Sequence, residues 1–262
     1  VNGFSVSQIR QIEPFIKVSD NPDATSFSFK EMMKEGAHEL VLRYQQVLNP
    51  QEGYSAIEDS VLAESPNRRY LGSSQKYYAR YRFKYSNKVS WGLTMEKDAG
   101  EEFFKGSIKQ GFDFYSGHVF FKGGKYVRAI ALGDYQVQIG QGVGFWSSYA
   151  FGKTADIATA KRTAIPLRAY TSVDESRFMR GAAVDLAYKN FELLLFSSRK
   201  NIDASSIADS TYDDLVFIST LDLSGLHRTN REISTMNGLK ENIVGANLNY
   251  RVGLLKLGFS GI

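Results

Sequence analysis

One stretch with a two-residue period, residues 76–98 (KYYARYRFKYSNKVSWGLTMEKD), constrains the fold of this chain more than any other segment. In its first half aromatic and small side chains alternate with mostly cationic ones, and in its second half apolar side chains alternate with polar ones. Successive side chains of a β-strand point to opposite faces, so the pattern predicts two amphipathic strands. Ser86 and Asn87 lie between them, which is the length of a two-residue hairpin turn.

Each arm of this hairpin has about 11 residues, the length that a tilted strand needs to cross the core of a bilayer. An amphipathic hairpin with an aromatic face and a charged face is the repeating unit of an outer-membrane barrel. We therefore expect one face of the sheet to contact lipid and the other to line a lumen. The side chains expected to contact lipid are Tyr77, Tyr81, Phe83, Trp91, Leu93, Val184, Leu186, Leu193, Leu195, Leu257 and Phe259.

The spacing of strands and turns along the whole chain follows the same template. Short and long connections alternate over nine predicted strands, as they do in outer-membrane barrels, which have short periplasmic turns and long extracellular loops. We therefore predict extracellular long loops and a periplasmic N-terminus. The predicted strands are residues 39–48, 75–85, 88–98, 112–121, 125–140, 178–189, 191–200, 243–250 and 254–261, and the long loops are roughly residues 49–74, 99–111, 147–177 and 201–242.

Helix signals precede the first predicted strand. Ser5 with Gln8, and Ser28 with Glu31, have the spacing of a capping box at the start of a helix. The fold class predicted is mostly β, an antiparallel up-and-down transmembrane β-barrel preceded by short helices. Its predicted parts are residues 1–37, a periplasmic helical segment with a linker, and residues 38–262, the N-terminal portion of the barrel.

The number of predicted strands bears on whether the barrel closes. Nine is odd, whereas bacterial single-chain barrels usually have an even number of strands. The last predicted strand, residues 254–261, has no predicted partner on one side. Because an unpaired apolar edge recruits another strand or aggregates, we predict that these strands do not close a barrel and that the chain is the N-terminal part of a longer protein.

The composition excludes several other classes. The chain has 262 residues, of which 43% are apolar and 23% charged, and no apolar run approaches the roughly 18 residues of a membrane helix. A helical membrane bundle is therefore excluded. The absence of cysteine excludes disulfides and thiolate metal sites. The net charge of +4 is too small to argue for nucleic-acid binding.

The sequence contains no convincing catalytic or metal-binding motif. The glycines at 140, 142 and 144 follow a predicted strand, but no helix start follows them, as a dinucleotide-binding loop would require. His38, His118 and His227 are far apart in the sequence and have no evident partners for a zinc or nucleophile site. We therefore predict no enzymatic activity, no catalytic or metal site and no cofactor.

The charged face of the predicted barrel is the strongest functional candidate. Charged lumen walls tune which solutes pass through a pore. Alternatively, inward-pointing arginines and glutamates pair with one another and fill a closed barrel, and the sequence leaves both interpretations open. The lumen-facing candidates are Arg80, Arg82, Lys84, Glu96, Arg128, Asp134, Gln136 and Gln138.

A second set of charges lies in and beside a predicted extracellular loop. Paired carboxylates in a loop can bind Ca²⁺ or act as general acid and base, but here arginines surround them. We therefore predict an ordered loop held by ion pairs. The candidates for these pairs are Arg168, Asp174, Glu175, Arg177 and Arg180.

Five segments together carry a family resemblance: residues 80–88 (RYRFKYSNK), 96–104 (EKDAGEEFF), 111–116 (GFDFYS), 132–142 (LGDYQVQIGQG) and 168–172 (RAYTS). In this combination the chain resembles the large outer-membrane proteins of the Bacteroidota described as helix-hairpin-helix domain-containing proteins. The resemblance implies a competence-like helix-hairpin-helix region followed by a β-barrel.

Residues 3–16 resemble the tail of such a helix-hairpin-helix region. A DNA-binding hairpin needs a glycine-rich turn whose amides contact phosphate, and only Gly3 of such a turn is present. We therefore do not expect this chain to bind nucleic acid.

The function predicted from the sequence is that of an integral outer-membrane β-barrel protein acting in solute passage or surface binding. Its expected partners are the lipid bilayer and, in addition, other outer-membrane proteins or the barrel-assembly machinery. The alternative is a barrel without a transport role, as a subunit of a larger outer-membrane complex or as a folding client of that machinery. A soluble ligand-binding β-barrel is a more distant alternative.

Overall fold

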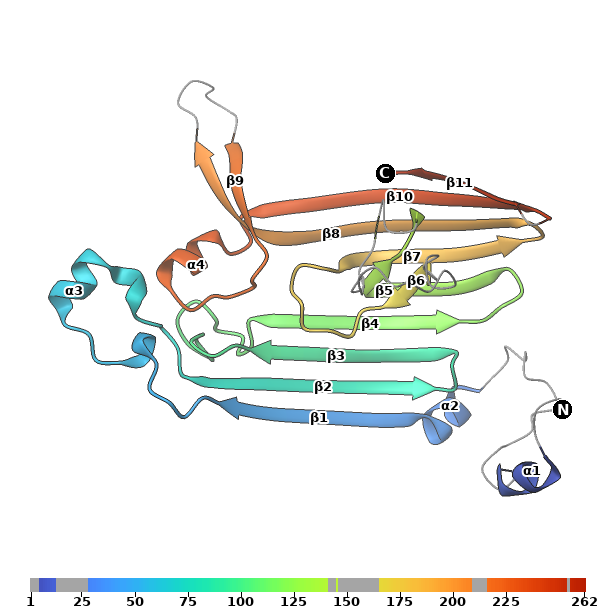
Figure 1. Cartoon of the computed structure of the whole chain (residues 1–262), viewed down its shortest axis with the longest axis horizontal. Helices are drawn as coiled ribbons and strands as arrows, with labels where there is room; N and C mark the ends of the chain where they lie inside the picture. The colour runs from blue at the N-terminus through green and yellow to red at the C-terminus, as the bar shows by residue number, and fades with distance from the viewer. Residues whose placement is uncertain (1–4, 13–27, 141–144, 146–164, 209–215, 254) are drawn as a thin grey trace.

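The computed structural model describes residues 5–12, 28–140, 145, 165–208, 216–253 and 255–262. They form one large antiparallel sheet with up-and-down strand order (Figure 1), as the alternating pattern predicts. The order across the sheet is β1-β2-β3-β4-β5-β7-β8-β10-β11, with β6 paired to β5 and β9 paired to β8. The strands are β1 (Ala37–Gln46), β2 (Gln75–Tyr85), β3 (Val89–Lys97), β4 (Phe114–Lys122), β5 (Val127–Val137), β6 (Leu167–Ala169), β7 (Met179–Tyr188), β8 (Phe191–Ala208), β9 (Val216–Asp222), β10 (Leu239–Val252) and β11 (Leu255–Gly261).

Short helices lie at the ends of the strands. The backbone N–H of Ser5 donates to Gln8 Oε1 at 2.9 Å, and that of Ser28 donates to Glu31 Oε2 at 3.3 Å, so the two predicted capping boxes are confirmed. The expected linker between them lies outside the described residues. The helices are α1 (Val6–Ile12), α2 (Phe29–Glu35), α3 (Asp59–Glu64) and α4 (Asn230–Thr235), with 3₁₀ turns at Glu52–Tyr54 and Pro66–Arg68. No helix in the described part of the chain is long and apolar enough to cross a membrane.

The predicted strands all exist, but the predicted long loops contain further structure. Residues 201–242 include the end of β8, all of β9, α4 and the start of β10. The end of β8 (NIDASSIA) consists mostly of small and polar residues, with two isoleucines among them, so it carries a weak strand signal in sequence. In the structure it pairs with β9. Strand β6 is three residues long and was likewise expected to be loop.

The arrangement of the connections agrees with the prediction. The turns β2–β3, β4–β5, β7–β8 and β10–β11 lie at one end of the sheet, on the right in Figure 1. The segments that carry α3, α4 and β9 lie at the opposite end, which we call the loop end. Which end faces the cell exterior stays a prediction.

The register places the predicted apolar side chains on a single face of the sheet. Residues directly opposite each other in an antiparallel pair point to the same side. Tyr81 lies between Leu40 and Leu93, which are its partners on β1 and β3. At the other side of the sheet, Leu193 of β8 lies opposite Leu186 and Leu248, and Leu248 lies opposite Phe259. We call this surface the apolar face.

Phe83 corrects the expectation for the apolar face. It was predicted to contact lipid, but it is completely buried together with Met32 and Val89. Helix α2 lies over it, and Gly36 at the end of that helix is so close that a Cβ there would be 2.2 Å from the Phe83 ring. The apolar face is therefore covered by α2 at its short-turn end.

The opposite face, which we call the charged face, holds the main hydrophobic core. Ala131 on β5, Ala183 on β7 and Phe196 on β8 lie in one row of the register and are buried. Leu167 of β6 packs on this cluster. The core therefore fills the charged face over the middle strands, and the charges lie around it.

The sheet is open. β1 pairs with β2 alone and β11 pairs with β10 alone, and the described residues contain no pairing between β1 and β11. This confirms the expectation that these strands do not close on themselves. The sheet therefore has two edges whose outward backbone groups lack a partner strand within the described residues.

Candidate functional site

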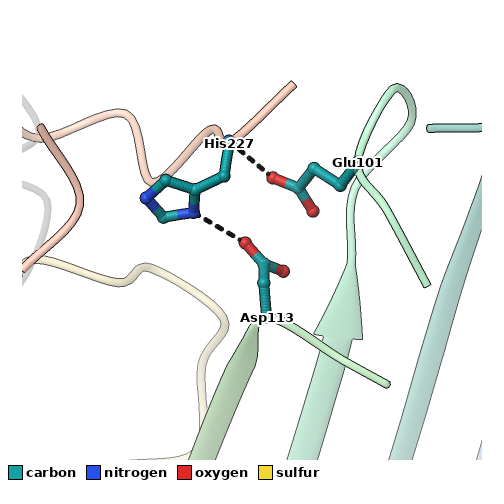
Figure 2. Close-up of side chains that lie close together, drawn as sticks. All are labelled: Glu101, Asp113 and His227. Carbon is teal, nitrogen blue, oxygen red and sulfur yellow. Dashed lines mark hydrogen bonds and ion pairs between the residues drawn. The ribbon is translucent and has the colours of Figure 1, made fainter. Parts of the chain in front are cut away.

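A buried cluster of one histidine and several carboxylates lies at the loop end (Figure 2). His227, between β9 and α4, is in contact with Asp113, which directly precedes β4, and with Asp203 on β8. Its Nδ1 is 2.9 Å from Asp113 Oδ2, and its Nε2 is 2.9 Å from Asp203 Oδ2. Glu101, after β3, accepts the backbone N–H of His227 at 2.9 Å.

Backbone hydrogen bonds hold the members of this cluster in place. The second oxygen of Glu101 accepts the N–H of Asp98 at 2.6 Å, which closes the turn after β3. Asp203 accepts the N–H of Asn237 at 2.7 Å through its other oxygen. Each carboxylate thus bridges two segments, and the cluster joins the β3–β4 connection, β8 and the β9–β10 connection.

The hydrogen bonds of the imidazole determine its charge. Because both ring nitrogens contact a carboxylate oxygen, both carry a proton, and His227 is an imidazolium. Burial opposes this charge, but the hydrogen bonds to Asp113 and Asp203 outweigh it and raise the pKa of His227 to about 10. Both partners of this contact are shielded from bulk solvent, since the side chains of His227 and Asp113 are only 4% and 1% exposed.

Two glutamates beside the imidazolium are held in the neutral form. Burial, followed by the negative charge of Asp113, raises the pKa of Glu101 to about 9. Burial and the charges of Asp113 and Glu101 raise the pKa of Glu175 to about 9 as well. At neutral pH the cluster thus combines one imidazolium with two protonated glutamates.

The same residues have donor atoms of the kind that divalent metals bind. Ligand atoms of Glu101, Asp113 and His227 all lie within 4.8 Å of one another, and carboxylate oxygens with an imidazole nitrogen suit zinc and related ions. A metal at Nδ1 would have to replace the proton that this atom donates to Asp113. The geometry therefore fits a proton-bridged network that fastens the loop end, and it would need rearrangement to hold an ion.

A polar cavity of about 210 Å³ adjoins the cluster. Glu175, Asp203, Asp222 and His227 are among the side chains that line it. Carboxylic acids thus share the lining with apolar side chains and with Arg180, and the protonated glutamate lines the same space as the imidazolium.

Most of the lumen-facing candidates are engaged in ion pairs. Arg80 and Arg82 each donate to Glu39 of β1 at 2.6 Å. Glu96 is buried and pairs with Lys76 at 3.0 Å and with Arg43 at 3.2 Å. These contacts favour the interpretation that inward charges on β1–β3 pair with one another.

The remaining lumen-facing candidates lie on β5. Arg128 pairs with Asp185 at 3.0 Å and with Glu192 at 2.8 Å on the neighbouring strands β7 and β8. Gln136 accepts the Nε–H of Arg168 at 2.8 Å, and Gln138 accepts the N–H of Ile165 at 3.1 Å. The two glutamines therefore hold the segment around β6 rather than standing free in a channel.

Asp134 lies at a fork in the sheet. The ladder between β4 and β5 ends at His118 opposite Gly133, and beyond it β5 pairs with β6. Asp134 accepts the N–H of Gly117 at 3.2 Å and pairs with Arg180 at 2.7 Å, and Arg180 donates to Tyr115 O at 2.8 Å. This ion pair therefore replaces the missing strand-to-strand bonds.

The predicted network of loop ion pairs exists only in part. Asp174 pairs with Arg177 at 3.5 Å, whereas Arg180 pairs with Asp134 on β5. Glu175 has no arginine partner in the described part of the chain and instead lines the cavity beside His227. The sequence does not predict the cluster, because its members lie far apart in the chain and only the folded sheet brings them together.

Comparisons with protein-family models, with curated proteins and with solved structures find no match. The resemblance to the helix-hairpin-helix domain-containing outer-membrane proteins therefore stays a prediction.

Proposed function

We propose that this chain is an integral outer-membrane protein whose sheet forms part of the wall of a β-barrel acting in solute passage or surface binding. The observation that supports it is the band of exposed apolar side chains on one face of an amphipathic antiparallel sheet. Large exposed members of this band, by register, are Leu40, Leu42, Leu93, Val119, Leu132, Leu195, Val244, Leu248, Leu257 and Phe259.

Water is a poor solvent for such a face. Monomeric soluble proteins rarely expose contiguous apolar patches of more than a few hundred Å². A bilayer covers this kind of surface, and strands of about 9–11 residues span its core. β2 and β5 have 11 residues each, and β3 and β4 have 9 each, which fits that length.

The two open edges require a partner in this setting. An unpaired backbone group in a bilayer costs several kcal/mol, so β1 and β11 cannot stay bare there. We propose that further strands, from the same protein or from another outer-membrane protein, complete the wall by pairing with these edges.

Membrane extraction tests the proposed location. We expect the protein, expressed with a signal for export, to stay with the outer membrane after washing with urea and to require detergent for solubility. Recovery in the soluble periplasmic fraction without detergent would overturn the proposal and would support a soluble barrel.

A non-transporting barrel subunit is the second candidate. It is favoured by the mutual pairing of charges around Glu39 and Glu96 and by the core that fills the charged face over β5, β7 and β8. Conductance of liposomes that contain the purified protein separates the two. A barrel that passes solutes should give stepwise conductance, whereas a barrel whose interior is filled by paired charges and core side chains should give none.

A further inference from the structure

We propose that a pocket on the charged face, at the short-turn end of β2–β4, binds a small oxyanion of the phosphate class. This pocket has a volume of about 300 Å³. The lining side chains that can donate hydrogen bonds to an anion include those of Arg82, Lys84, Ser90, His118 and Thr171. No carboxylate lines the pocket among the residues that the structure describes.

Two buried nitrogens at this pocket lack a hydrogen-bond partner. In the described part of the chain, the buried polar side-chain atoms without a partner are Arg80 Nε, Arg82 Nε and His118 Nε2. Arg82 and His118 line the pocket, and His118 is only 8% exposed. A buried polar atom without a partner is unfavourable, so an acceptor that enters the pocket removes that penalty.

The positions of these side chains follow from the register. Arg82 lies opposite Gly92, and Gly92 lies opposite His118, so the three positions form one row across β2, β3 and β4. Since Gly92 has no side chain, it leaves space between the guanidinium and the imidazole. A Cβ at this position would be 2.6 Å from Tyr81 O and 3.2 Å from His118 Cε1.

The chemistry of the lining selects the ligand. Guanidinium and ammonium groups form charge-assisted hydrogen bonds with phosphate oxygens, and hydroxyl groups and an imidazole N–H add further donors. Lys84 is exposed and lines the pocket, and among the described residues it forms no ion pair with a carboxylate, so it adds positive charge at the pocket wall. A tetrahedral oxyanion accepts bonds from several directions at once, which suits donors that come from three strands.

In the proposed barrel this pocket would be a binding position for anionic solutes along the wall. That role, though not the binding itself, rests on the proposed function. Binding itself does not require that function. Failure of the protein to bind phosphate in detergent would leave its outer-membrane location intact, and failure to fractionate with the membrane would leave the binding result intact.

Calorimetric titration of the detergent-solubilised full chain with inorganic phosphate tests the site. A second arm uses glucose 6-phosphate with glucose as its control, which separates free phosphate from the phosphate group of a larger solute. We expect saturable phosphate binding at low salt, no glucose binding, and roughly tenfold weaker phosphate binding in Lys84→Gln. Lys125→Gln, which removes an exposed charge outside the pocket lining, is the matched control and should bind as the unaltered protein does.

His118→Phe removes the imidazole donor and should abolish saturable binding. If this variant does not fold, Lys84→Gln carries the test, since its side chain is exposed. Absence of saturable binding by the unaltered protein at millimolar phosphate would overturn the proposal. Equal weakening by Lys84→Gln and Lys125→Gln would overturn it too, because net charge alone would then explain the binding.

Discussion

Leu93 reports which solvent covers the apolar face. It is 44% exposed and lies between Tyr81 on β2 and Gly117 on β4. We expect Leu93→Arg to destabilise the protein by roughly 2–4 kcal/mol if the residue lies near the middle of a bilayer. Leu93→Ala is the matched control, since it removes apolar area without adding charge. Refolding into lipid vesicles over a denaturant series measures both variants, and equal small effects would contradict lipid contact.

The contact between Gly36 and Phe83 makes a second prediction for a single residue. Gly36→Ala places a methyl group against the Phe83 ring, so α2 must shift, and we expect a loss of about 1–3 kcal/mol in the free energy of unfolding. Gly117→Ala is the control, because the nearest atom to a Cβ there is 3.7 Å away. Equilibrium unfolding compares the two. Equal stability of both variants would show that α2 does not hold the end of the apolar face.

Among the structural elements, the fork between β4 and β5 depends on one ion pair. The carboxylate of Asp134 is 1% exposed, and removing its partner leaves a buried charge. Since Arg180 is itself half-exposed, we expect Arg180→Gln to cost roughly 3 kcal/mol, at the low end for breaking a buried pair.

Arg177→Gln provides the matched control for the fork. Its pair with Asp174 is more exposed on both sides, so its loss should cost at most about 1 kcal/mol. The backbone N–H of Gly117 donates to the Asp134 carboxylate. Hydrogen exchange at this amide should become faster in Arg180→Gln and stay unchanged in Arg177→Gln. Unchanged exchange in both variants would contradict the role given to the pair.

The elements also show what the sequence reveals and what it does not. β2 matches its predicted range of residues 75–85, because aromatic and cationic side chains alternate throughout it. β9 is not predicted from the sequence, although its residues (VFISTLD) are rich in strand formers, because its partner, the end of β8, is mostly small and polar and gives only a weak strand signal. The cluster around His227 was missed for another reason: Glu101 is 126 residues away in sequence, and only the sheet brings them together.

For the whole molecule, the proton-bridged cluster makes the stability of the loop end depend on pH. Burial and neighbouring carboxylates raise the pKa of Glu101 and of Glu175 from 4.5 to about 9, and hydrogen bonds to aspartates overcome burial to raise that of His227 from 6.5 to about 10. The folded state therefore holds more protons than the unfolded state, and stability falls as pH rises. The loss runs from about pH 4.5 to 9 for the glutamates and from about pH 6.5 to 10 for His227.

We expect the denaturant midpoint to be lower at about pH 9 than at about pH 6. The double variant Glu101→Gln with Glu175→Gln keeps neutral side chains at both pH values, so the difference between its two midpoints should be smaller. The same difference in the variant and the unaltered protein would show that the cluster does not control the pH dependence.

The up-and-down order of the sheet also determines the order in which it can assemble. Along the main path nearly every strand finds its partner in the next strand of the chain, so hairpins can add one after another with short closures. In the described sheet, the outer edges of β1 and β11 are not paired by any of these hairpins. If further strands complete the sheet as proposed, covering those two edges is the last step of its assembly, and until then each edge can pair with any strand that reaches it.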